Sequence, residues 1–132
     1  MFKETVKYTD FDGNQREEDL YFHLSPAEMT QLQYSVKGGL KAKLEEAMKM
    51  QDGTTMMSFF IQIVKKAYGR KSADGRKFEK SEEIYEDFEQ TNAYNELFMK
   101  LVTDESFANR FVAAVLPDMS KYADKPAIAA TT

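Results

Sequence analysis

The chain has 132 residues, of which 42% are hydrophobic and 13% aromatic, and its formal net charge at pH 7 is −4. This length suits one domain with one core rather than two, and the aromatic content is high enough to exclude wholesale disorder. The acidic balance argues against nucleic acid and anionic membranes as partners, and the absence of cysteine excludes disulfides and thiolate chemistry.

An N-terminal β-hairpin is predicted between Phe2 and Leu24. Apolar residues alternate on both sides of Asp12-Gly13-Asn14, where Gly and Asn can supply the positive φ angles of a tight reversal. One face of the hairpin is therefore expected to be buried. The expected inward row is Val6, Tyr8, Phe11, Leu20, Phe22 and Leu24.

Three helices are predicted after the hairpin. Ser25-Pro26-Ala27-Glu28 has the pattern of a capping box with proline at the first helical position, and it predicts a helix from Pro26 to about Val36. Gly38-Gly39 interrupts this helix, and a second is expected over Leu40–Met50, ended by Asp52-Gly53. A third, capped by Thr54 or Thr55, is expected over Met56–Ala67; its apolar residues cover more than a narrow stripe, which indicates a central helix. The expected inward residues of these two helices are Leu40, Leu44, Ala47, Met48, Phe59, Phe60, Ile63, Val64 and Ala67.

The pattern changes at Tyr68–Lys80, a basic stretch around Asp74-Gly75 that predicts a short exposed hairpin or an ordered loop. Three further amphipathic helices are predicted, and the chain is expected to form one α+β, mainly α-helical domain over residues 1–117 with a short flexible tail over 118–132. The three helices are expected from the Ser81 cap through Gln90, over Asn92–Val102, and over Ser106–Leu116, where Pro117 stops the last one.

Catalytic and cofactor chemistry has few candidates, and no catalytic, cofactor-binding or metal-binding residue is predicted. The single histidine, His23, falls inside a strand pattern and is interpreted as a structural or surface residue. Adjacent carboxylates such as Glu45-Glu46 diverge on a helix, so they do not form an acid/base pair. Asp10–Asn14 has its glycine too early for a calcium loop and lacks the bidentate glutamate.

The first ten residues lack the pattern of a secretion signal, which favours a cytoplasmic protein.

Protein binding is the remaining kind of function, and three groups of residues are candidates. Basic residues in the Tyr68–Lys80 turn are flanked by acidic neighbours that oppose a polyanion, so they favour a protein partner over nucleic acid. Methionines near the start of the third helix can line an adaptable groove, although core filling is the alternative. The candidates are Arg70, Lys71, Arg76 and Lys77 in the turn, Met56 and Met57 (with Met48 and Met50 nearby), and the aromatics Tyr94 and Phe98.

Two stretches resemble the tail assembly chaperone family of siphophages. Tyr68–Ser81 contains a basic YG-x-K-S-x-D-G-R turn and a Phe-x-Lys-Ser helix start. Phe88–Leu101 then reads F-x-Q-T-x-A-Y-x-E-L-F and is followed by a closing helix that ends at Leu116-Pro117. The resemblance covers Tyr68–Pro117 well, and the rest only in length and general organisation.

The resemblance implies a protein of the host cell cytoplasm that binds the tape measure protein during virion morphogenesis, helps tube subunits polymerise around it, and is absent from the mature virion. It also implies a programmed ribosomal frameshift in many members, whose longer product recruits the tail tube protein; the short end after Pro117 would suit the shorter product. Self-association is a further expectation. The alternatives are a structural virion protein of the head–tail region or tail, and a small regulatory nucleic-acid-binding domain.

Overall fold

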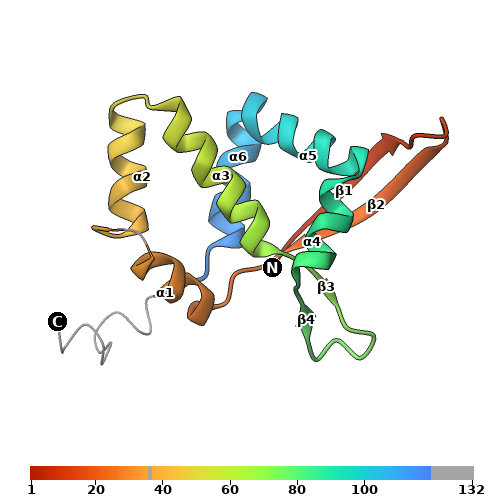
Figure 1. The fold of residues 1–132 in the computed structure, drawn as a ribbon, viewed down its shortest axis with the longest axis horizontal. Coiled ribbons are helices and arrows are strands. Elements are labelled where there is room, and N and C mark those ends of the chain that lie inside the picture. The colour runs from red at the N-terminus through yellow and green to blue at the C-terminus, as the bar shows by residue number, and fades with distance from the viewer. Residues whose placement is uncertain (36, 120–132) are drawn as a thin grey trace.

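The computed structural model describes residues 1–35 and 37–119, except for the side chains of Lys41, Leu44 and Met48. Within these residues the chain forms four strands and six helices, which confirms the predicted α+β class with a hairpin followed by six helices (Figure 1). From residue 120 onward, the predicted tail lies outside the described residues. The elements are β1 (Phe2–Thr9), β2 (Gln15–Phe22), α1 (Pro26–Tyr34), α2 (Leu40–Lys49), α3 (Gly53–Ala67), β3 (Tyr68–Lys71), β4 (Phe78–Glu79), α4 (Glu82–Glu89), α5 (Asn92–Thr103) and α6 (Glu105–Val115).

The predicted N-terminal hairpin is formed by β1 and β2, which pair antiparallel from Phe2↔Phe22 to Thr9↔Gln15. Gly13 has a φ of +86° in the turn, as the Asp12-Gly13-Asn14 pattern predicted. The inward row is buried, but Phe11 is 80% exposed, so the prediction for Phe11 was wrong. The reason is that the ladder ends at Thr9, which places Phe11 in the turn, where strand alternation no longer directs it to the core. The buried members of the row are Val6, Tyr8, Leu20, Phe22 and Leu24.

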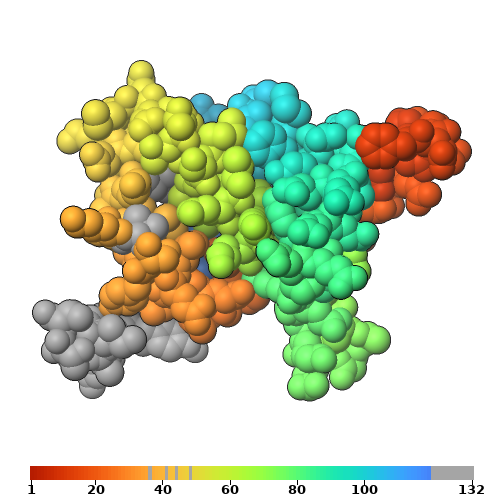
Figure 2. Space-filling view, in the orientation of Figure 1, coloured from red at the N-terminus to blue at the C-terminus, as the bar shows by residue number. Residues whose placement is uncertain are grey.

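The Tyr68–Lys80 stretch forms a hairpin that joins the sheet, giving the strand order β1-β2-β3-β4. β3 pairs with β2 only at Tyr21↔Gly69 and Phe22↔Tyr68, and then leaves β2 to pair with β4. Gly69 permits this crossing, because a Cβ atom there would lie 2.7 Å from the Phe78 ring and 2.8 Å from the Glu79 carbonyl oxygen. Two hairpins therefore project from the helical body, as the space-filling view shows (Figure 2).

Two of the predicted helix caps are present: Ser25 and Glu28 form the capping box of α1, and Ser81 caps α4. Thr91 caps α5 and Asp104 caps α6, and neither cap was predicted. The third helix ends at Ala67 as predicted, but its predicted start and cap were wrong: α3 begins at Gly53 and is capped by Asp52, whose side chain accepts from the Thr55 amide. Asp52 had been interpreted as ending α2. That helix ends earlier, through Gln51 in the left-handed conformation (φ +53°) and a hydrogen bond from the Asp52 amide to the Ala47 carbonyl.

The core lies where the inner face of the long hairpin meets α3, α4, α5 and α6. Phe22 is fully buried, with its ring centroid 5.2 Å from that of Phe111 and 6.2 Å from that of Phe88. Phe2 lies edge-on to Phe107 and Phe111 at 5.9 and 5.3 Å. On α3, Phe59, Ile63, Val64 and Ala67 are buried as predicted and Phe60 is half-buried. Leu40 and Ala47 are buried in α2, whereas the side chains of Leu44 and Met48 lie outside the description.

Candidate partner-binding surfaces

The four basic side chains predicted as a binding cluster lie on the β3–β4 hairpin and are all exposed. They do not form one continuous patch. Arg70 is turned toward α4, where its Nη2 lies 2.6 Å from Asp87 Oδ2, and the Lys71 ammonium lies 4.5 Å from the centroid of the Tyr21 ring on β2. Only Arg76 and Lys77 remain near the tip of the hairpin, where Ser72 Oγ donates to Asp74 Oδ1 at 2.7 Å and helps to close the turn.

One half-buried ammonium group anchors this hairpin to the body. Lys80 Nζ contacts both carboxylate oxygens of Glu28 at 2.8 and 2.9 Å, the His23 carbonyl at 2.6 Å and the Lys66 carbonyl at 2.7 Å. Burial lowers the pKa of Lys80, and Glu28 opposes that shift. Burial alone would raise the pKa of Glu28, but hydrogen bonds from Lys80 and the Ser25 amide outweigh it, so the pKa of Glu28 is lowered. Lys80 thereby ties β4 to the ends of β2 and α3 and the start of α1.

The histidine belongs to the same junction. His23 is half-buried, its ring lies edge-on to Phe78 with centroids 6.0 Å apart, and burial lowers its pKa. Its main chain is used as well, because the amide donates to the Ala67 carbonyl and the carbonyl accepts from Lys80. His23 therefore packs as a structural residue. Among the described residues, no group of three or more His, Cys, Asp or Glu side chains is placed to hold a metal ion.

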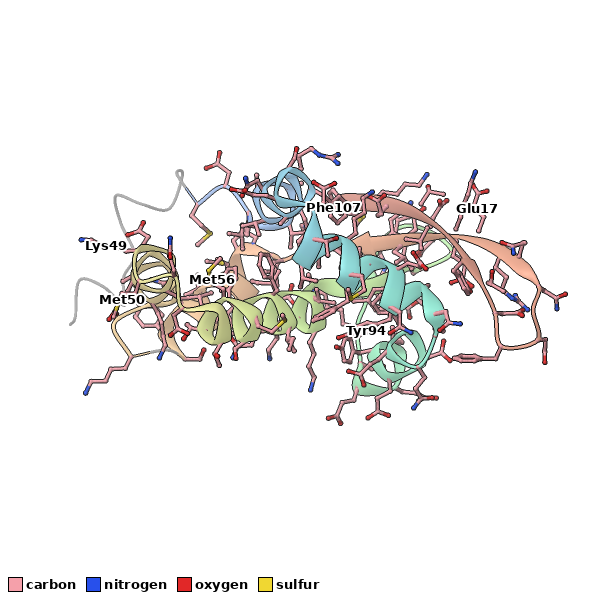
Figure 3. The ribbon with its side chains drawn as sticks, turned by 90° about the horizontal axis from the view of Figure 1, so that it is seen from above. Glu17, Lys49, Met50, Met56, Tyr94 and Phe107 are labelled. Atoms are coloured by element: carbon pink, nitrogen blue, oxygen red, sulfur yellow. The ribbon has the colours of Figure 1, made fainter. Side chains whose placement is uncertain are left out.

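The predicted aromatic pair lies at the surface of the core. Tyr94 and Phe98 are half-buried and stacked on each other, with ring centroids 5.8 Å apart. Tyr94 also lies edge-on to Phe88 at 5.4 Å and to Tyr85 at 6.4 Å, in the space between α4 and α5 (Figure 3). These contacts assign both rings mainly to packing and leave part of each ring accessible to a partner.

The methionines near the α2–α3 junction differ in exposure. Met56 is half-buried, whereas Met57 is 37% exposed and Met50 is 71% exposed. Ile61, one turn after Met57, is 40% exposed, so α3 presents an outward apolar pair that the sequence analysis missed. The i, i+4 spacing was the available signal, but it was hidden because α3 is apolar on most of its circumference. Met99 and Val102 on α5 are also exposed, at 55% and 38%.

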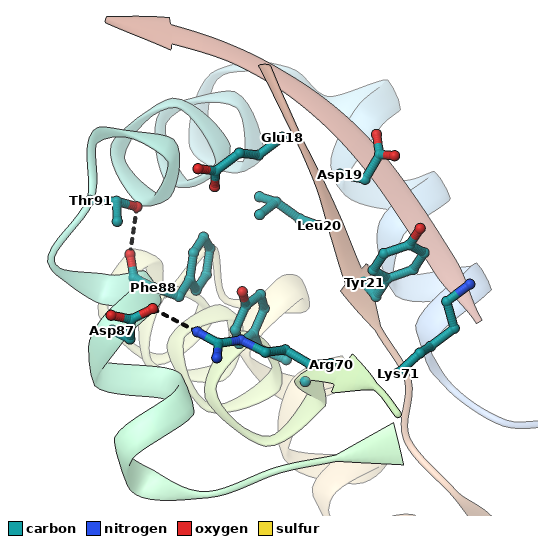
Figure 4. Close-up of a pocket in the computed structure, with 11 residues that line it drawn as sticks. Glu18, Asp19, Leu20, Tyr21, Arg70, Lys71, Asp87, Phe88 and Thr91 are labelled. Carbon is teal, nitrogen blue, oxygen red and sulfur yellow. Dashed lines mark hydrogen bonds and ion pairs between the residues drawn. The ribbon is translucent and has the colours of Figure 1, made fainter. Parts of the chain in front are cut away.

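Two hollows border the long hairpin, one along each edge. The first has a volume of about 480 Å³ and lies between β2, β3 and α4; Glu18, Leu20, Arg70 and Phe88 are among its lining residues (Figure 4). The second, of about 450 Å³, lies between β1 and α5 and is crossed by the ion pair of Lys100 with Glu4 at 3.4 Å. Sequence reasoning did not predict either hollow, because both depend on how the hairpin sits against the helices.

The described part of this small α+β protein presents two projecting hairpins, outward apolar residues on α3 and α5, and two hollows beside the sheet. In the described residues, no helix is long and apolar enough to cross a membrane.

A sequence model of the phage tail assembly chaperones matches residues 1–130, so the chain belongs to this phage tail assembly chaperone family. No curated protein and no solved structure matches the chain significantly. Membership in a chaperone family suggests a role without catalysis.

Proposed function

We propose that this protein binds the tape measure protein of its phage, keeps it soluble before the tail tube encloses it, and promotes polymerisation of tube subunits in the host cytoplasm without remaining in the virion. The observation that carries the proposal is the family match over residues 1–130. A long helical tape measure exposes apolar stripes that aggregate unless another protein covers them. The chaperone supplies that cover until the tube replaces it.

The outward apolar pair on α3 is the surface we assign to this contact. Met57 and Ile61 lie one helical turn apart and are 37% and 40% exposed, and neighbouring Ser58 and Gln62 are exposed polar residues. An amphipathic helix can lay its apolar stripe along such a strip, and methionine adapts to different partner side chains. The strip is small, so the affinity of one copy is modest. Many copies along one tape measure, with self-association between them, hold it by avidity and are still displaced by tube subunits.

A longer form of the chain, made by ribosomal frameshifting, would add a segment that recruits the tail tube protein. In this proposal the domain of residues 1–117 contacts the tape measure and the added segment brings the tube subunit to it. Expression of the viral gene in its natural context, followed by mass spectrometry of the products, tests this part. A single product that ends at Thr132 would contradict it.

The first test is co-expression with the tape measure protein encoded by the same genome. Recovery of a soluble complex is the expected result, and persistent aggregation of the tape measure protein beside a folded, unbound chaperone would overturn the proposal. Met57→Glu combined with Ile61→Glu should abolish co-purification. Ser58→Glu combined with Gln62→Glu is the matched control, because it adds the same charges to exposed positions of the same helix. Lys71→Glu with Arg76→Glu tests whether the β3–β4 hairpin contributes.

Two alternatives give different results in simple assays. A structural protein of the head–tail region or the tail would be detected in purified virions by mass spectrometry, where a chaperone is missing. A regulatory nucleic-acid-binding domain would shift DNA or RNA at low salt through the β3–β4 hairpin. The charges around this hairpin argue against nucleic-acid binding, because Arg70 is paired with Asp87 and the adjoining helix α4 is rich in acidic side chains.

A further inference from the structure

The projecting part of the β3–β4 hairpin is an arm, residues 70–80, that adds no side chain to the apolar core (Figure 1). Away from its base, the arm touches the body through exposed contacts. Arg70 pairs with Asp87, and the Lys71 ammonium lies 4.5 Å from the centroid of the Tyr21 ring. Exposed ion pairs and exposed cation–π contacts each contribute little to stability. The arm can therefore leave the body without opening the core.

The base of the arm is held by a cage of four oxygen atoms that all belong to the body. They are the two carboxylate oxygens of Glu28 and the carbonyl oxygens of His23 and Lys66, and the Lys80 ammonium lies 2.6 to 2.9 Å from each of them. The cage residues are fixed by contacts that do not involve the arm. Glu28 also accepts from the Ser25 amide, the His23 amide donates to the end of α3, and Lys66 lies in the last turn of that helix. The cage therefore keeps its shape when the arm leaves.

Gly69 joins the arm to the body and sets the closed position. It is paired with Tyr21 of β2, and the returning strand β4 packs directly on it. A Cβ atom on Gly69 would lie 2.7 Å from the Phe78 ring and 2.8 Å from the Glu79 carbonyl oxygen, so any side chain there pushes β4 outward. Lys80 follows Glu79 directly, so this displacement draws the ammonium out of its cage. Closure therefore needs a bare backbone at Gly69 as well as the ammonium of Lys80.

We propose that the arm opens as one unit while the body stays folded, and that the Lys80 ammonium in its oxygen cage is the latch that holds the arm closed. The arm forms one wall of the first hollow, through Arg70 and Lys71 (Figure 4). Opening removes this wall, so the latch controls how much of the hollow a partner reaches. The inference does not rest on the tape measure proposal, because it does not involve the apolar strip on α3.

Amide hydrogen exchange of the full chain, followed by nuclear magnetic resonance, tests whether the arm opens separately. The Ser72 amide donates to the Lys77 carbonyl at 2.8 Å within the arm, and the His23 amide donates to the Ala67 carbonyl at 2.9 Å in the body. Ser72 should exchange through an opening that is about tenfold more populated than the one that exposes His23, and low concentrations of urea should change it little. Equal opening and equal urea dependence at the two amides would overturn the proposal.

Lys80→Ala tests the latch, because it removes the ammonium and leaves the cage. Exchange at Ser72 should rise about tenfold, whereas Lys77→Ala, which removes an exposed ammonium of the same arm, should leave it unchanged. Propylammonium supplies the atoms that Lys80→Ala removes, so millimolar concentrations should slow the exchange again. Tetramethylammonium is the control, because it carries the same charge but has no hydrogen to donate to the cage. No slowing by propylammonium, or equal slowing by both cations, would contradict the latch.

Gly69→Ala tests the closed geometry with the ammonium retained. Acetylation with acetic anhydride followed by mass spectrometry measures how often Lys80 leaves its cage, and the exposed Lys77 is the internal reference. In the wild type, Lys80 should react about tenfold more slowly than Lys77. Gly69→Ala should bring the reaction of Lys80 close to that of Lys77, because the added Cβ displaces β4. A folded Gly69→Ala protein in which Lys80 stays as protected as in the wild type would overturn the proposal.

Discussion

The two hairpins of this molecule are held in place by different forces. The β1–β2 hairpin has eight cross-strand pairs and a buried row that includes Val6, Leu20 and Phe22, so apolar burial fixes it to the helices. The β3–β4 hairpin has two pairs of its own, and it is held to the body by two pairs with β2, by the Arg70–Asp87 ion pair and by the Lys80 ammonium group at its base. The long hairpin is held mainly by the burial of its apolar face, whereas the short, charged hairpin is held largely by hydrogen bonds and ion pairs.

The largest expected effect is on the apolar side of this comparison. Phe22→Ala should lower the free energy of unfolding by ~3–5 kcal/mol, because Phe22 is fully buried among Phe2, Phe88 and Phe111 and the surrounding rings cannot close the cavity. Urea denaturation followed by circular dichroism measures it. Phe11→Ala in the same hairpin is the control, since Phe11 is 80% exposed and its loss should change stability little. Similar effects of the two substitutions would contradict this account of the hairpin.

The polar anchor should give the next largest effect. Lys80→Met keeps most of the side-chain volume but leaves Glu28 without its cation and the carbonyls of His23 and Lys66 without their donor. We expect a loss of about 1–3 kcal/mol in the free energy of unfolding. Faster amide exchange at Tyr68–Lys71 should accompany it. Lys77→Met removes an exposed lysine of the same hairpin and should leave both measurements unchanged; a Lys80→Met protein that matches it would show that the anchor is dispensable.

Acid should weaken the same anchor. The pKa of Glu28 is lowered in the folded protein from an ordinary value of 4.5, so the unfolded chain takes up a proton first as the pH falls. The stability that Glu28 contributes is therefore present above about pH 4.5 and is lost below it. The urea midpoint of the wild type should fall toward that of Glu28→Gln between pH 7 and pH 3. Carboxylates such as Asp10 and Asp52, whose pKa values are also lowered, remain in both proteins. Parallel pH curves would exclude a charged contribution from Glu28.

The smallest expected effect concerns a polar group without a hydrogen bond. Tyr85 Oη is buried and has no hydrogen-bond partner at normal geometry in the described residues, while burial together with nearby Tyr94 and Glu89 raises the pKa of its phenol. Tyr85→Phe should therefore leave stability unchanged or raise it by up to about 1 kcal/mol. Tyr8→Phe is the contrasting variant, because the Tyr8 hydroxyl donates to Glu18, and it should lower stability. A clear loss of stability in Tyr85→Phe would reveal a hydrogen bond of this hydroxyl.

Local patterns in the sequence determined most of the elements. The turn at Gly13 and the capping box of Ser25 and Glu28 depend on residues close together in the chain, so their structures followed from residue type and spacing. The wrong predictions arose where neighbouring residues could play the same role or where a pattern was continued too far. Asp52, Thr54 and Thr55 are all able to cap α3, and the structure uses Asp52, because Gln51 ends α2 in the left-handed conformation. Phe11 was assigned to the core because the apolar alternation was extended past the end of the strand.

The candidate surfaces could be predicted only in part. Basic residues, methionines and aromatics identified where partners were expected, but their accessibility depended on contacts between distant segments. Arg70 is paired with Asp87, Lys71 lies over Tyr21, and Tyr94 packs between α4 and α5. The sequence by itself determined the class of fold, the order of the elements and most of the inward residues of the long hairpin and of α3. Tertiary structure alone decided that β3 leaves β2 after Gly69 and pairs with β4 instead, because strand pairing depends on non-local hydrogen bonds that no local pattern records.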